Sequence, residues 1–168
     1  MRKAAADPND QKTGLTDELV ESLMFSTTRV PGSIGMALVQ FPETVRQSPQ
    51  TYKPAILALL KKVDVADPIS ESEFAAFRTA LKGLHVPSAI INRIVSLCFP
   101  TQLANTVTDA AMDELYRKLV ASGILDEIPV NDSETRWFVQ NCAVSDCIRS
   151  VIPNTDDAWR SCLIWTLR

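Results

Sequence analysis

The residues best equipped for chemistry in this sequence are its cysteines and its single histidine. The cysteines stand at positions 98, 142, 147 and 162, and the histidine at position 85. Zinc prefers four ligands at short, regular spacings, but no CxxC pair occurs. A cysteine nucleophile needs a nearby base, and one histidine allows only one pairing. The pattern therefore favours buried thiols and places His85 at a helix junction, with no metal site and no cofactor.

Carboxylates and glycines also lack a catalytic arrangement. Glu71 and Glu73 belong to a predicted helix cap, and Asp156 and Asp157 to a turn. The five glycines never form a GxGxxG or GxxxxGK pattern that would hold a phosphate. We therefore expect a protein that is not an enzyme. A cysteine- or metal-dependent enzyme remains the alternative, which elemental analysis would detect.

Charge and hydropathy limit the classes of partner. The 168 residues include 17 Lys and Arg against 20 Asp and Glu, a net charge of −3, and no dense basic run that would follow a nucleic-acid backbone. The longest apolar run, residues 55–60, is far shorter than the roughly 20 residues of a membrane span. The sequence thus predicts a cytoplasmic protein with no nucleic-acid partner and no membrane insertion.

Apolar spacing predicts a mostly α protein. Residues 1–14 resemble a disordered tail, and residues 15–125 a compact domain of about six short helices. Each helix has a recognisable start: Thr16, Pro31, Pro54, the Ser70 and Glu73 capping box, Pro87, and Thr108. Gly83 and Gly123 are expected to end two of these helices in the left-handed conformation.

The period of the pattern changes after the helical domain. Residues 126–134 have the composition of a linker, with Pro129, Asn131 and Asp132. Apolar and polar residues then alternate over 135–144 and again over 158–168, which predicts a short antiparallel β pair within a β-rich segment, 135–168. The fold class is therefore mostly α with an α+β C-terminal unit.

Tryptophans dominate that β segment. Trp159, Leu163 and Trp165 fall on one face of the second predicted strand. Two isolated strands are marginal in water, so this face requires a helix or another chain against it. We expect it to bind a protein partner, while filling of the chain's own core is the structural alternative.

The order of parts resembles the COMM-domain proteins. The segment "ISESEFAAFRTALKGLHVPSAIINRIVSLCF" (residues 69–99) is similar to the family's helical stretch, and "RWFVQNCAVSDCIRSVIP" (residues 136–153) to the opening of its COMM domain. The chain differs in having Phe138 where the family has a basic residue, and in lacking the family's later strands and C-terminal helix. It therefore resembles a divergent or C-terminally shortened member.

The resemblance implies a non-enzymatic scaffold subunit. Commander-complex proteins pair through their COMM domains and act in endosomal cargo recycling and in NF-κB and ubiquitin regulation, which implies an endosome-associated location. Trp137 and Pro153 would belong to the dimerisation segment, and the partner would be another COMM-like chain or a second copy. The alternative hypothesis is a self-contained helical adaptor or microbial regulatory protein, in which residues 135–168 fold back on the helices and a groove between helices binds a peptide.

Overall fold

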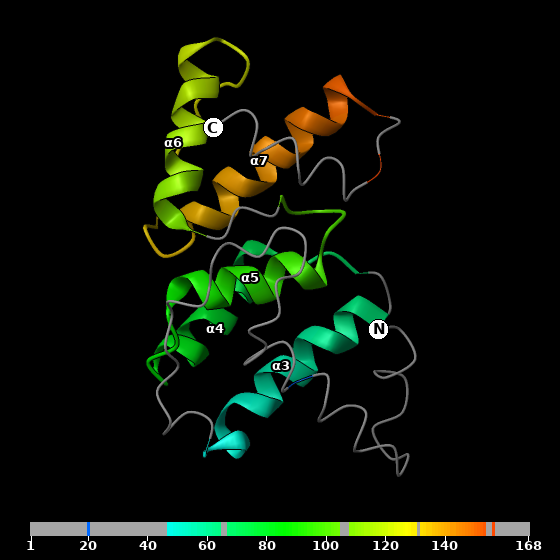
Figure 1. Cartoon of the computed structure of the whole chain (residues 1–168), viewed down its shortest axis with the longest axis vertical. Coiled ribbons are helices and arrows are strands. Elements are labelled where there is room, and N and C mark those ends of the chain that lie inside the picture. Colours follow the sequence, from blue (N-terminus) through cyan, green and yellow to red (C-terminus); the bar gives the residue numbers. More distant parts are fainter. Residues whose placement is uncertain are drawn as a thin grey trace.

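The computed structural model describes residues 20, 47–64, 67–104, 108–130, 132–153 and 156. Five α-helices with no strand among them account for most of this part of the chain: α3 (Pro49–Asp64), α4 (Glu71–Lys82), α5 (Ser88–Cys98), α6 (Asp109–Ala121) and α7 (Arg136–Val151). Figure 1 shows α3, α4 and α5 together, with α6 and α7 crossing beside them. The two groups meet where α7 packs on α4.

Helix α3 confirms the predicted third helix but begins earlier than expected. It starts at Pro49, so Pro54 lies inside it rather than in its first turn. Pro54 is on the exposed side, where a missing backbone hydrogen bond leaves the freed carbonyl open to water. The opposite face is apolar and buried, through Tyr52, Ile56, Leu59 and Leu60.

The start of α4 is the capping box predicted from the sequence. Ser70 Oγ accepts a hydrogen bond from the Glu73 backbone N–H at 3.3 Å, and Glu73 Oε2 accepts one from the Ser70 N–H at 2.8 Å. These bonds satisfy two donors that the first turn would otherwise leave unpaired. The predicted cap is confirmed in both directions.

Helix α4 ends at Lys82 with Gly83 as its C-cap, as predicted, but the left-handed conformation predicted for Gly83 is wrong. Gly83 keeps a helical φ of −57°, and His85 takes the left-handed conformation with φ 60°. Hydrogen bonding continues beyond the last helical residue, because the Val86 N–H donates to Leu81 O at 3.1 Å and the His85 N–H to Lys82 O at 2.8 Å. This is a Schellman closure with His85 at its left-handed position and buried Val86 behind it. His85 is thus a helix-junction residue, as expected.

Helix α5 confirms its predicted start, and α6 confirms both its predicted start and its predicted end. Pro87 precedes the first residue of α5, and Pro100 follows its last turn. Thr108 Oγ1 accepts a hydrogen bond from the Ala111 N–H at 3.3 Å, and Gly123 closes α6 with φ 68°.

Helix α7 overturns the predicted strand over 135–144. Its buried side chains recur one, three and four positions apart, as one face of a helix requires: Trp137, Phe138, Gln140, Asn141, Val144, Ser145 and Ile148. The short alternation around Trp137 and Val139 predicts a strand because polar Gln140, Asn141 and Ser145 interrupt the apolar stripe of this face. Val139 is only half-buried, since it lies beside the packed face.

A buried arginine joins four parts of the fold. The Arg78 guanidinium on α4 donates to Asp109 at 3.1 Å and to Glu134 at 3.2 Å, and reaches Asn92 and Ser88 of α5 at 3.4 and 3.3 Å. Only 5% of its side chain is exposed. The starts of α6 and α7 are therefore fixed relative to α4 and α5, which positions the groove between α6 and α7.

Four predicted elements lie outside the described residues. They are the tail 1–14, the helices behind Thr16 and Pro31 apart from Val20, and the strand 158–168. Val20 is helical and fully buried. Across the described helices, none is both long and apolar enough to span a membrane.

Candidate functional site: a groove between α6, α7 and residues 126–130

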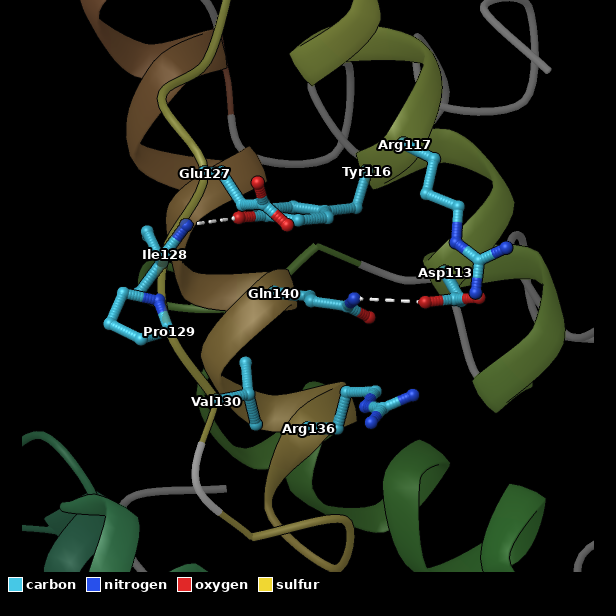
Figure 2. Close-up of a pocket in the computed structure, with 9 residues that line it drawn as sticks. All are labelled: Asp113, Tyr116, Arg117, Glu127, Ile128, Pro129, Val130, Arg136 and Gln140. Carbon is cyan, nitrogen blue, oxygen red and sulfur yellow. Dashed lines mark hydrogen bonds and ion pairs between the residues drawn. The ribbon is translucent and has the colours of Figure 1, made fainter.

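An open groove of about 510 Å³ lies between α6, α7 and the irregular segment 126–130, which we call the strap. One wall comes from α6, through Asp113, Tyr116 and Arg117, and the strap provides the other, through residues 127–130. Gln140 and Arg136 of α7 lie between them (Figure 2). This cavity brings apolar side chains together with polar groups that have no partner among the described residues.

Tyr116 holds the strap against α6. Its hydroxyl accepts a hydrogen bond from the Ile128 N–H at 2.7 Å and lies 3.4 Å from the Asp126 carbonyl. No carbonyl of residues 127–130 accepts a hydrogen bond from any described residue. The strap is therefore anchored at one point, while most of its backbone stays available to water or to a ligand.

Strap side chains add apolar surface at the edge of the groove. Ile128 is 37% exposed, Pro129 is exposed and Val130 is half-buried. Ile124, just before the strap, is 55% exposed but does not line the groove.

Gln140 provides the polar centre of the groove. Its Nε2 donates to Asp113 Oδ1 at 3.0 Å, which fixes the orientation of the amide because turning it over would bring its carbonyl against the carboxylate. Its Oε1 is buried and has no hydrogen-bond partner in the described part of the chain, and the residue is only 5% exposed. An unpaired buried acceptor costs about 1–3 kcal/mol, which a ligand donor would recover.

Charges at the groove fall into a paired set and an unpaired set. Asp113 is neutralised by Arg117 at 2.6 Å, one turn along α6. The side chains of Glu127 and Arg136 form no ion pair or hydrogen bond with described residues, and both are exposed. In Figure 2, Glu127 lies at the Tyr116 end of the groove and Arg136 at the opposite end, with Gln140 between them.

In two other cavities the charged side chains already pair with other described residues. One of about 450 Å³ contains Arg149, which bonds Asp146 at 3.1 Å and the Gln102 carbonyl at 3.2 Å. Another of about 330 Å³, between α3 and α4, is lined largely by alanines, and its Lys62 and Glu73 pair with each other at 2.8 Å. Neither cavity presents an unpaired buried group.

Two of the described cysteines, Cys98 and Cys142, are poorly suited to nucleophilic chemistry. Burial raises the pKa of the Cys98 thiol to about 12 and, together with the nearby Asp146 carboxylate, the pKa of Cys142 to about 11. The thiolate, which is the reactive form, is therefore scarce at neutral pH. In this part of the chain no group of three potential metal ligands gathers.

The residues predicted to bind a partner do not come together in the described structure. Trp137 is 2% exposed, with its ring 5.6 Å from that of Phe74 on α4. Pro153 is exposed two residues beyond the other end of α7, and the helix from Trp137 to Val151 alone spans about 21 Å at 1.5 Å per residue. Trp159, Leu163 and Trp165 lie outside the described residues.

Sequence reasoning missed the groove residues. The composition of residues 126–134 predicts a linker, and only the spacing of Ile128 and Val130 indicates that part of it packs on the fold. Arg136 and Gln140 stand four positions apart, on one side of a helix, whereas the alternation of their segment predicts a strand.

Comparisons with known proteins provide no relative. Neither family models, nor curated proteins, nor solved structures produced a match to this chain.

Proposed function

We propose that this chain is a non-enzymatic adaptor that binds an extended segment of a partner protein in the groove between α6, α7 and the strap. The observation that carries the proposal is the Gln140 carbonyl, buried at the centre of an open groove without a partner. A peptide backbone supplies N–H donors at regular intervals, which suits such an acceptor.

The strap favours a peptide over a compact ligand. The carbonyls of residues 127–130 lack partners among the described residues, and the apolar side chains of the strap border the groove. Extended peptides are commonly recognised in this way, with main-chain hydrogen bonds providing affinity and side-chain contacts providing specificity.

The scaffold role implied by the COMM-domain resemblance is compatible with an adaptor, but pairing through a strand at 135–144 is not part of our proposal. That segment is helical, and its tryptophan already packs on Phe74. The proposal therefore relies on the α6–α7 groove as the binding surface.

Selection of peptides from a random displayed library by the full chain would test the adaptor function. Affinities of selected peptides would be measured by fluorescence anisotropy for the chain and two variants. Ile128→Asp places a charge at the groove, whereas Ile124→Asp makes the same change at an exposed position outside it. We expect Ile128→Asp to weaken binding at least tenfold and Ile124→Asp to leave it within twofold. Equal effects of the two changes, or no selected peptide, would contradict the proposal.

A further inference from the structure

The two unpaired charges at the ends of the groove suggest which peptides it selects. Asp113 and Arg117 neutralise each other, but Glu127 and Arg136 have no side-chain partner among the residues described. Both charged groups are therefore free to pair with a ligand without first breaking an internal ion pair. Figure 2 shows them at opposite ends, separated by Gln140.

We infer that the groove selects an extended peptide with an acidic side chain at the Arg136 end and a basic side chain at the Glu127 end. This inference depends on the proposed peptide-binding function and specifies its ligand. The guanidinium of Arg136 can bind a carboxylate through two parallel N–H donors, and the Glu127 carboxylate accepts from a lysine or arginine.

Backbone dimensions give the spacing of the two ligand charges. Residues 127 and 130 are three steps apart, which span at most about 11 Å of extended chain. The strap passes from Glu127 to Val130 along the groove toward Arg136. A peptide lying beside it would thus carry its two charges about three to four residues apart, with apolar residues between them against Ile128 and Val130.

The size of the selectivity follows from the exposure of both groups. Exposed ion pairs contribute at most about 1 kcal/mol, so each charge is expected to change affinity by no more than about fivefold. Salt screens such pairs, and the preference should decrease as ionic strength rises. Gln140 and the strap provide affinity, while the end charges set the ligand's sequence and direction.

A charge exchange between protein and peptide tests the inference. A selected peptide whose binding is lost in Ile128→Asp is synthesised with Glu, Gln or Lys at its acidic position. Affinities are measured for the full chain, for Arg136→Glu and for Lys61→Glu, which makes the same charge change on the exposed side of α3, away from the groove. We expect the unmodified chain and Lys61→Glu to prefer the Glu peptide by up to about fivefold, and Arg136→Glu to prefer the Lys peptide.

The outcomes separate this inference from the function on which it depends. Peptides that bind and respond to Ile128→Asp, but whose charge preference is the same in Arg136→Glu, would overturn the inference and leave the adaptor function intact. Absence of any groove-dependent peptide would overturn both. Occupation of the groove by a second copy, seen as a dimer in light scattering that Ile128→Asp converts to a monomer, would also overturn the inference.

Discussion

The side-chain amide of Asn141 pairs with both backbone groups of Ala104. Asn141 Nδ2 donates to the Ala104 carbonyl at 3.0 Å, and its Oδ1 accepts from the Ala104 N–H at 2.7 Å. Gln102 makes the same two bonds to Ile69, at 2.8 and 3.0 Å. Each side-chain amide thus pairs with both the N–H and the C=O of one backbone residue, as a neighbouring β-strand would. These bonds join α7 and the start of α4 to the segment after α5.

We predict that Asn141→Leu lowers the free energy of unfolding by about 2–4 kcal/mol. The substitution leaves the buried Ala104 backbone without its partner, and each unsatisfied group costs about 1–3 kcal/mol. Gln102→Leu should cost less, because Gln102 is only partly buried and water can replace its amide. Urea unfolding of both variants measures the difference. A smaller loss in Asn141→Leu than in Gln102→Leu would contradict this role.

The closures of α4 and α6 predict opposite responses to glycine. His85 is an exposed non-glycine residue with φ 60°, so His85→Gly should stabilise the chain by about 0.5–1 kcal/mol. Gly123→Ala should cost about 1 kcal/mol through its backbone conformation alone, since a Cβ there meets no atom within 4 Å. Thermal unfolding compares the two. Destabilisation by His85→Gly would show that the imidazole has a role beyond the turn.

Glu73 should contribute stability that depends on pH. Hydrogen bonds from Lys62 and from Ser70 hold the pKa of Glu73 at about 2, below its usual value near 4.5. Its contribution is therefore complete above about pH 4.5 and is lost as the pH falls toward 2. Glu73→Gln should lower the melting temperature at pH 7, with the two curves converging near pH 2.

Glu127→Gln is the control for this pH dependence. The Glu127 side chain has no partner among the residues that the structure describes, so its melting curve should match that of the unmodified chain at every pH. A Glu73→Gln difference that stayed constant down to pH 2 would exclude ionisation as its cause.

Local signals were sufficient to predict α4, α5 and α6. A capping box at Ser70, proline at 87 and threonine at 108 act within one or two turns, so the sequence contains the information that sets these boundaries. The left-handed conformation predicted for Gly83 is found at His85 instead, because the closing hydrogen bonds extend to Val86, whose apolar side chain is buried.

Helix α7 and the groove could not be predicted locally. The buried face of α7 includes Gln140 and Asn141, whose partners Asp113 and Ala104 lie 27 and 37 residues away. Tertiary contacts pair both polar ends of the Asn141 amide and the Nε2 of Gln140, and in the sequence these polar residues hide the helical period. The strap likewise has the composition of a linker, and only the tertiary hydrogen bond from the Ile128 N–H to the Tyr116 hydroxyl shows that it packs on α6.

The Gln140 side-chain amide gives the most direct test of the adaptor proposal. In the ¹H–¹⁵N spectrum of the full chain, titration with a selected peptide should shift the Gln140 side-chain NH₂ signals, assigned by their loss in Gln140→Leu, together with the backbone amides of Ile128 and Val130. The amide of Ala58, in the cavity between α3 and α4, should stay in place. Saturable binding that moves the Ala58 signal and leaves Gln140 unchanged would contradict the account.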